Sequence, residues 1–199
     1  MIFDEQTLGV IEWVAAALGV INISLLIFRS VWNYPFGIAM VALYTFIFFE
    51  KRLYAESGLQ IFFILAQLWG WYLWVKVGGE DDRVPVRWLS KLGRAVWFTV
   101  TAALSLNLGW VMYTFTNAAL PYADSGIAGA SVAAQILLAY RRIENWVIWI
   151  AIDVVSIGLY INRELYPTAG LYGGFLVLSL IGLKEWIAAE KNGKSALPA

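Results

Sequence analysis

Residues 29–74 read RSVWNYPFGIAMVALYTFIFFEKRLYAESGLQIFFILAQLWGWYLW, and residues 141–186 read RRIENWVIWIAIDVVSIGLYINRELYPTAGLYGGFLVLSLIGLKEW. With a shift of 112 positions and no gap, the two stretches are identical at twelve of their 46 positions. Apolar residues match often by chance, but arginine, asparagine, tyrosine, glycine and tryptophan also match in this one register. The sequence therefore indicates an internal duplication, which extends outward to residues 12–74 over residues 124–186.

The chain is too apolar for a soluble domain. It is 14% charged and 61% hydrophobic, whereas soluble domains are about 25% charged. A helix needs about 20 apolar residues, with a range of roughly 17–25, to cross a bilayer. Seven apolar runs reach or approach this length: Leu8–Phe28, Tyr34–Phe49, Tyr54–Val77, Ala95–Phe115, Ser125–Tyr140, Trp146–Ile161 and Leu165–Ala189. The sequence predicts an all-α membrane protein, one integral membrane domain over residues 1–199 with seven transmembrane helices.

The basic residues alternate between the two sides of the predicted membrane domain. Eleven lie on one side: Arg29, Lys76, Arg83, Arg87, Lys91, Arg94, Arg141, Arg142, Lys184, Lys191 and Lys194. The other side has only Lys51, Arg52 and Arg163. Basic residues favour the cytoplasmic side, so we expect the N-terminus outside and the C-terminus in the cytoplasm.

The repeat groups the seven predicted helices as three, one and three. Repeat A covers residues 8–77, a linking helix covers residues 93–115, and repeat B covers residues 124–189. A single helix between two three-helix repeats gives both repeats the same orientation, so we expect parallel repeats, as in the SWEET sugar transporters. Such repeats place a central site near the middle of the membrane, which is typical of a secondary transporter. An old duplication that is kept only for packing is the alternative.

Cysteine and histidine are both absent from the sequence. Disulfides, thiolate catalysis, haem ligation by histidine and ordinary zinc sites are therefore excluded. The sequence also has no Gly-rich phosphate-binding loop. We expect no cofactor, no metal and no catalytic residue, because one deep carboxylate without a second acid makes a poor intramembrane active site.

The run Trp146–Ile161 has a polar stripe. Five residues follow helical spacing: Trp146, Trp149, Asp153, Ser156 and Tyr160. A carboxylate about two turns inside a span costs roughly 2.5–3.5 kcal/mol, so Asp153 should face a polar cavity or a partner. Tryptophan faces beside a carboxylate suit a flat cationic ring. Alternatively, Asp153 bonds to a neighbouring helix and the tryptophans anchor an interface.

Amide side chains mark a second candidate face. Gln60, Gln67 and Trp71 are spaced seven and four residues apart in the run Tyr54–Val77, so they share one side of that helix. An amide both donates and accepts hydrogen bonds, so it suits a carboxamide or a sugar hydroxyl. Gln135 and Tyr172 are candidates for similar contacts. For each residue alone, hydrogen bonding between helices is an equally good interpretation.

Asn33 and Asn145 occupy equivalent positions in the two repeats, and each is followed by an aromatic residue. Asparagine is a favoured N-cap, and Pro35 fits a first helical turn. Helix capping is therefore one interpretation of this pair. A cytoplasmic gate that includes Asn33 and Tyr34 is the other.

Five segments carry a wider pattern: Trp32-Asn33-Tyr34-Pro35-Phe36-Gly37, Leu53-Tyr54-Ala55, Gly70-Trp71-Tyr72-Leu73-Trp74, Glu144-Asn145-Trp146-Val147-Ile148-Trp149 with Asp153, and the stretch from Leu165-Tyr166 to Trp186. Over nearly its whole length, the chain resembles the PnuC-type nicotinamide riboside transporter family. The resemblance implies a three-plus-one-plus-three fold, a homotrimer and facilitated diffusion of an unphosphorylated vitamin precursor, which a separate cytoplasmic kinase traps by phosphorylation. It also implies the following ligand contacts: Asn145, Trp146, Trp149, position 153 and Gln60.

We therefore expect a carrier for the facilitated uptake of nicotinamide riboside in a bacterial inner membrane. Its partners would be the small-molecule substrate, the lipid bilayer and further copies of the chain, with no nucleic acid. Asp153 and the two tryptophans would meet the cationic pyridinium ring of the substrate. Thiamine is also a cationic aromatic vitamin, and it fits the same residues as an alternative substrate. A membrane protein that only binds partners is a more distant alternative.

Overall fold

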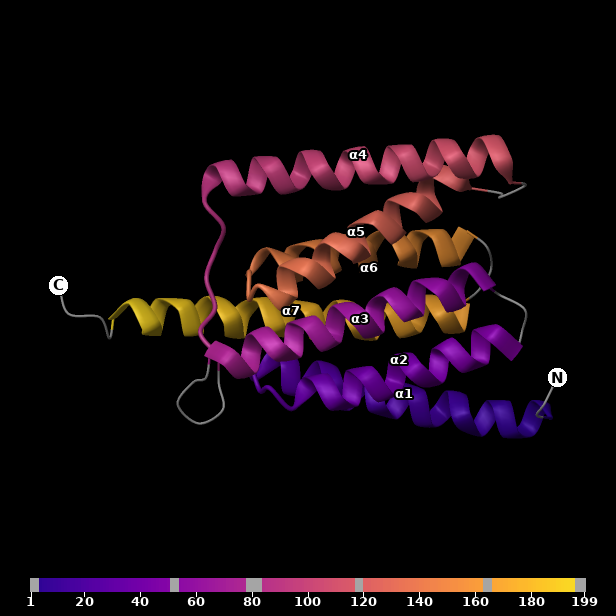
Figure 1. Ribbon diagram of the computed structural model, residues 1–199, viewed down its shortest axis with the longest axis horizontal. Helices are drawn as coiled ribbons and strands as arrows, with labels where there is room; N and C mark the ends of the chain where they lie inside the picture. The colour runs from indigo at the N-terminus through magenta and orange to yellow at the C-terminus, as the bar shows by residue number, and fades with distance from the viewer. Residues whose placement is uncertain (1–3, 51–53, 78–83, 117–119, 163–165, 196–199) are drawn as a thin grey trace. The chain divides into compact units, whose positions relative to one another are not determined.

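The computed structural model describes residues 4–50, 54–77, 84–116, 120–162 and 166–195. These residues form seven α-helices (Figure 1): α1 Glu5–Ile27, α2 Asn33–Glu50, α3 Tyr54–Val77, α4 Lys91–Phe115, α5 Pro121–Ala139, α6 Glu144–Asn162 and α7 Tyr166–Ser195. Each predicted apolar run corresponds to one of these helices, so the prediction of an all-α fold with seven helices is confirmed. Lys51, Arg52, Arg83 and Arg163, which entered the charge count, lie outside the described residues.

Within the described residues, five helices are long and apolar enough to cross a membrane. Their apolar parts are Gln6–Ile27, Ser57–Val77, Lys91–Phe115, Glu144–Asn162 and Ala169–Gly193. The two other helices, α2 and α5, have 18 and 19 residues and do not qualify as candidate spans. Five candidate spans support a multi-pass membrane protein.

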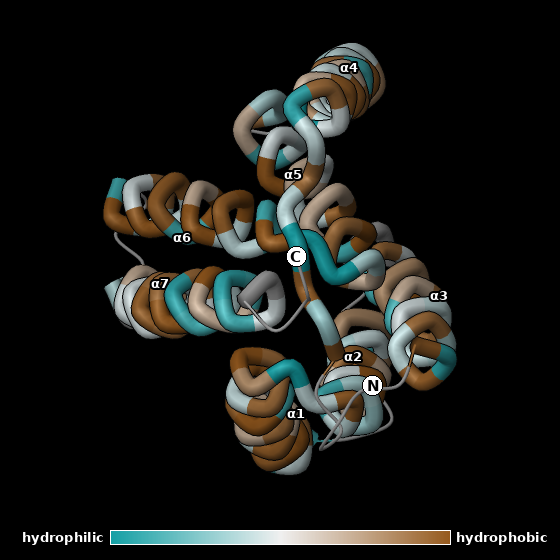
Figure 2. Tube along the Cα trace, turned by 90° about the vertical axis from the view of Figure 1, so that its left-hand side faces the viewer, coloured by the Kyte–Doolittle hydropathy of each residue, from teal (hydrophilic) through white to brown (hydrophobic). Residues whose placement is uncertain are grey.

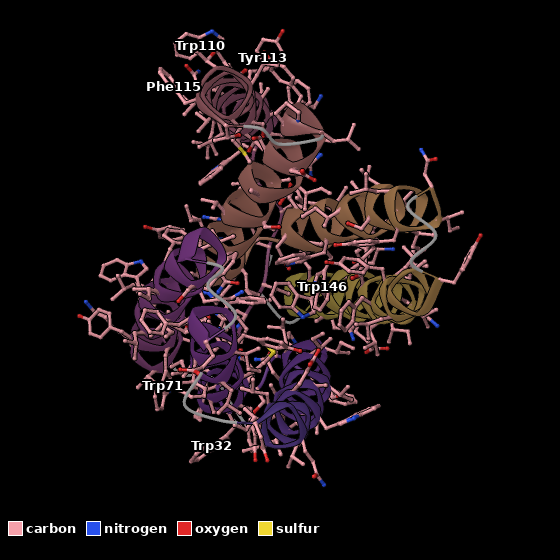
Figure 3. The ribbon with its side chains drawn as sticks, turned by 90° about the vertical axis from the view of Figure 1, so that its right-hand side faces the viewer. Trp32, Trp71, Trp110, Tyr113, Phe115 and Trp146 are labelled. Atoms are coloured by element: carbon pink, nitrogen blue, oxygen red, sulfur yellow. The ribbon has the colours of Figure 1, made fainter. Side chains whose placement is uncertain are left out.

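The helices expose large apolar side chains, and hydrophobic colours dominate them in Figure 2. Phe98 on α4 is 77% exposed and Trp13 on α1 is 80% exposed. On the same α4, Trp110, Tyr113 and Phe115 are exposed (Figure 3), and the Tyr113 ring also lies 6.3 Å from the ring of Tyr122 on α5. An apolar surface of this extent suits contact with lipid or with another protein rather than with water.

The chain divides into two compact units, Met1–Pro85 (unit 1) and Val86–Ala199 (unit 2). In unit 1, α2 packs against both α1 and α3 (Figure 1). The first helix begins at an N-cap, where the Asp4 carboxylate accepts a hydrogen bond from Thr7 N at 2.9 Å. Interactions with Thr7, first with its side chain and then with its backbone N–H, lower the pKa of Asp4. In unit 2, α5 packs against α4 and α6, and α6 packs against α7.

Two turns with the same backbone geometry follow α1 and α5. Arg29 has a φ of 61° and Arg141 has a φ of 58°, and among the described residues they are the only non-glycine residues with positive φ. In each turn, the N–H of the arginine and the next N–H donate to carbonyls three and five residues back, at 2.8 to 3.0 Å. This is the Schellman pattern of helix termination, in which glycine is usual at the left-handed position. The two turns lie 112 positions apart, which is the spacing of the sequence repeat.

Candidate functional site

Helix α6 has a polar stripe on its buried face. Trp146 is 2% exposed, Asp153 is 4% exposed and Ser156 is 1% exposed, whereas Trp149 and Tyr160 are half-buried. The exposed residues of α6 include Val147, Val154 and Val155, which lie on the opposite side. Trp146, Asp153 and Ser156 therefore face the interior of unit 2, as their helical spacing predicted.

The polar stripe begins at Trp146, whose ring packs against α7 (Figure 3). The indole rings of Trp146 and Trp186 meet edge to face, with centroids 5.7 Å apart and planes at 87°. On α7, Gly182 leaves room for the same ring, because a Cβ atom there would lie 2.5 Å from Trp146 Cη2. An edge-to-face aromatic pair contributes about 0.5–1.5 kcal/mol beyond burial. Trp146 is therefore fixed in place from the α7 side.

Two further contacts continue along the seam between α6 and α7. Ser179 Oγ donates a hydrogen bond to Asp153 Oδ2 at 3.0 Å, and both side chains are buried. Nearer the other end of the seam, the rings of Tyr160 and Tyr172 lie 5.2 Å apart. The hydrogen bond of Asp153 to a neighbouring helix agrees with the structural interpretation of this carboxylate. It occupies one of the two carboxylate oxygens and leaves acceptor capacity on the group.

Three buried polar atoms on α6 have no hydrogen-bond partner in the described part of the chain: Asn145 Oδ1, Trp146 Nε1 and Ser156 Oγ. A buried polar atom without a partner costs about 1–3 kcal/mol, so native proteins keep few of them, and each calls for an explanation. The first two atoms belong to adjacent residues, and one is an acceptor while the other is a donor. This pair is the strongest sign of a binding site in unit 2.

The capping interpretation of Asn145 is wrong. Its amide nitrogen donates to Arg142 O at 2.6 Å, whereas an N-cap side chain would accept from a backbone N–H through its oxygen. The amide of Asn33 makes the same bond to Ser30 O at 2.6 Å. In both places, the amide nitrogen is held by the preceding turn, so the side-chain oxygen is turned away from that bond.

Unit 1 has a similar aromatic arrangement with tyrosine in place of tryptophan. The rings of Tyr34 and Trp74 lie 5.2 Å apart at 89°, edge to face. A Cβ atom at Gly70 would lie 2.6 Å from the Tyr34 hydroxyl. These three residues correspond, at a spacing of 112 positions, to Trp146, Trp186 and Gly182.

The candidate amides of unit 1 divide between the interior and the surface. Gln67 is buried, and its side-chain oxygen occupies the space that a Cβ atom at Gly37 would need. The amide of Asn22 reaches the same space and donates to Asn33 O at 2.7 Å. Gln60 and Trp71 are half-buried on α3. Sequence reasoning missed Asn22, whose only signal was an amide within an apolar run.

The remaining candidates of unit 2 lie outside the α6 cluster. Gln135 is buried on α5 and has no hydrogen bond to the α6 stripe among the described residues. Tyr172 lies beside Tyr160 and is separated from Asp153 along the seam. Gly182, Trp186 and Ser179 were not proposed as site residues, although the first two are identical in both repeats. Among the described residues, no three acidic side chains gather as a possible metal site.

Sequence comparison relates the whole chain to known transporters. It is 29% identical over 213 residues to the nicotinamide riboside transporter PnuC of Escherichia coli strain K12, covering 94% of this chain and 89% of that protein. It is 27% identical to the protein of the same name from Neisseria mucosa, covering 91% and 74% of the two chains. It is also 23% identical to the riboflavin/roseoflavin transporter RibM of Streptomyces davaonensis, covering 94% and 88%.

The fold is also similar to a solved structure, titled as the crystal structure of the vitamin B3 transporter PnuC. The TM-score is 0.76 at 23% sequence identity, covering 92% of this chain and 82% of that one. The predicted resemblance to PnuC-type transporters is thereby confirmed. Residues 9–188 match the family described as nicotinamide mononucleotide transporter, and the chain belongs to this family of membrane transporters.

Proposed function

We propose that this protein carries nicotinamide riboside across a bacterial inner membrane by facilitated diffusion and that it has no enzymatic activity. Membership of the transporter family supports a transport function. The names of the relatives in Escherichia coli and Neisseria mucosa point to nicotinamide riboside as the substrate. A cytoplasmic kinase then phosphorylates the substrate, and the added charge prevents its return.

One observation within unit 2 carries the choice of substrate. Asn145 Oδ1 and Trp146 Nε1 are buried atoms of two consecutive residues, an acceptor and a donor, without partners among the described residues. A carboxamide has the complementary pair, because its NH₂ donates and its carbonyl accepts. Nicotinamide riboside has such a carboxamide on its ring. Binding it would satisfy both atoms and offset their desolvation cost.

The charge on the substrate ring agrees with the rest of the α6 stripe. The pyridinium of nicotinamide riboside is cationic, and Asp153 is an acid near the middle of the same buried face. The half-buried Trp149 lies one turn from Asp153 and offers an aromatic face to the ring. We assign Gln135 and Tyr172, which belong to unit 2, to the ribose. The roles of Gln60, Gln67 and Trp71 of unit 1 as substrate contacts stay predictions from the sequence. We assign Asn33 and Tyr34 to a gate.

The proposed architecture is seven transmembrane helices in two parallel three-helix repeats. Repeat A covers residues 8–77, the linking helix covers residues 93–115 and repeat B covers residues 124–189. The matched turns at Arg29 and Arg141 support this division, as do the matched aromatic pairs in α2–α3 and α6–α7. The protein would be a homotrimer, with the N-terminus outside and the C-terminus in the cytoplasm.

Replacement of Trp146 by phenylalanine tests the proposed function, because it removes the N–H and keeps an aromatic ring. Purified W146F should bind nicotinamide riboside about 2-fold to 12-fold more weakly than the native protein, which is the effect of losing a neutral hydrogen bond. W110F is the matched control, because Trp110 is exposed on α4 and should have no effect. In proteoliposomes, the native protein should equilibrate the substrate without an ion gradient. Absence of nicotinamide riboside binding to the native protein would refute the proposal.

Riboflavin is the second candidate substrate, because the relative RibM is named for it. The riboflavin ring system is uncharged, so its binding should not depend on the charge of Asp153. The same titration with riboflavin and with thiamine as competitors separates the three vitamins. Tighter binding of riboflavin than of nicotinamide riboside would reverse the choice of substrate.

A further inference from the structure

Two arginine side chains lie side by side at the start of α6. Arg87, in the segment before α4, forms an isolated parallel β-bridge with Arg142. Arg87 N donates to Arg141 O, and Ile143 N donates to Arg87 O, both at 3.2 Å. Residues paired across a bridge have their side chains on the same face, where like charges repel each other. The backbone pairing therefore places the two arginine side chains on the same face, where the charge of Arg87 acts on Arg142.

The carboxylate nearest to this pair is already engaged elsewhere. Glu144 accepts a hydrogen bond from Leu89 N at 3.0 Å and another from Arg94 Nε at 2.7 Å. Neither Arg87 nor Arg142 has a side-chain hydrogen bond or ion pair with any residue in the described ranges. Burial and the neighbouring charge of Arg87 lower the pKa of Arg142, although Glu144 opposes this shift. Among the described residues, these two neighbouring cationic side chains therefore have no bonded counter-charge.

The fold itself does not require this pair. In unit 1, the corresponding turn is joined to the chain by Val84 N, which donates to Arg29 O at 3.3 Å. Ser30 stands at the position that corresponds to Arg142. In the equivalent turn of unit 1, the two positions are therefore occupied by uncharged residues, a valine and a serine. Membrane orientation does not explain the pair either. It depends on the number of basic residues near the helix ends, and it does not require two arginines to be paired across a bridge.

We propose that Arg87 and Arg142 bind a phosphate group. Arginine forks match phosphate oxygens with two parallel hydrogen bonds each, and an anion between two guanidinium groups removes their repulsion. Arg87 is exposed and Arg142 is half-buried, so the pair is open to a ligand and partly shielded from water. The phosphate belongs either to an anionic lipid headgroup or to a soluble nucleotide, since both present the same chemistry.

Thermal unfolding of the purified full-length protein in a neutral detergent tests the proposal. The lipid probe is dihexanoyl phosphatidylglycerol, compared with dihexanoyl phosphatidylcholine. The soluble probe is adenosine monophosphate, compared with adenosine, at constant ionic strength. We expect phosphatidylglycerol or adenosine monophosphate to raise Tm in a saturable way, whereas the two comparison compounds do not. A rise with phosphatidylglycerol alone identifies the lipid as the source, and a rise with the nucleotide alone identifies the soluble phosphate.

The double variant R87Q/R142Q should lose this rise. The control K91Q/K191Q removes two charges from exposed lysines and should keep it. If R87Q/R142Q is not recovered folded, the single variants R87K and R142K decide the question. Lysine keeps the positive charge but cannot form the two parallel hydrogen bonds of a guanidinium group, so the Kd of the probe should increase about tenfold. No rise in the native protein, an equal rise in R87Q/R142Q, or an unchanged Kd in both lysine variants would overturn the proposal.

Discussion

Replacement of Gly182 by alanine tests whether the Trp146 ring of α6 is a fixed wall of the proposed binding site. A Cβ atom at this position would lie 2.5 Å from two carbons of the Trp146 ring, Cη2 and Cζ2. Real side chains do not approach this closely, so the ring has to move. It is buried to 98% and meets Trp186 edge to face. The displaced ring therefore has to shift its contacts on α7, because it cannot turn freely into solvent.

The expected loss of stability follows from two opposing effects. Overpacking of a well-packed site costs about 1–3 kcal/mol. Alanine is favoured over glycine within a helix by about 0.5–1 kcal/mol, which offsets part of that cost. The free energy of unfolding should therefore decrease by about 1 kcal/mol and at most by about 2.5 kcal/mol, and Tm should decrease by about 2–4 °C and at most by about 10 °C for a chain of this length. If Trp146 Nε1 binds the substrate, its displacement should also weaken binding by about 2-fold to 12-fold.

Gly174 provides the matched control, because it lies on the same helix α7. A Cβ atom there would have no neighbour within 4 Å. G174A should keep the native substrate affinity, and its Tm should stay equal or increase slightly. Both variants are compared with the native protein by thermal unfolding in detergent and by titration with nicotinamide riboside. If G182A has the Tm and the Kd of G174A, Trp146 is not a fixed wall and the account of the α6–α7 seam is wrong.

Two further variants examine the acids of α6. Asp153→Asn keeps an acceptor for Ser179 Oγ, so folding should be preserved. The affinity for the cationic substrate should decrease by about 1–2 kcal/mol, because the negative charge is lost. Isothermal titration measures this loss, and an unchanged Kd would leave Asp153 with a structural role only. Glu144→Ala leaves the partly buried Leu89 N–H without its acceptor and should lower the free energy of unfolding by about 1–3 kcal/mol. Glu144→Gln keeps an acceptor oxygen and should lower it less, and equal Tm values for E144A and the native protein would contradict this role.

The helices of this protein were predictable because membrane insertion depends on a local property. A run of about 20 apolar residues forms a helix in a bilayer wherever it occurs, and each of the seven runs corresponds to one helix. The polar stripe of α6 was predictable for a similar reason. Helical spacing places Trp146 and Asp153 on one side whatever surrounds the helix, and burial selects that side over the valine face.

The turns were less predictable. Glycine is usual where a helix ends in a left-handed residue, yet this chain has Arg29 and Arg141 there. Nothing in an isolated arginine indicates positive φ, and only the match between the repeats marked these positions. Asparagine statistics favoured a cap at Asn145, but its amide nitrogen is bonded to the preceding turn instead. Local preference failed because both places are shaped by the chain that packs around them.

Composition and periodicity alone predicted a helical membrane protein with a polar stripe on one of its helices. Only tertiary structure decided which atoms meet across elements. It brings Gly182 against Trp146 and Ser179 to Asp153, and it sets Arg87 beside Arg142. The physical reason is that helix formation in a membrane satisfies hydrogen bonds within one segment. Contacts between segments depend instead on the close packing of faces that are distant in the chain.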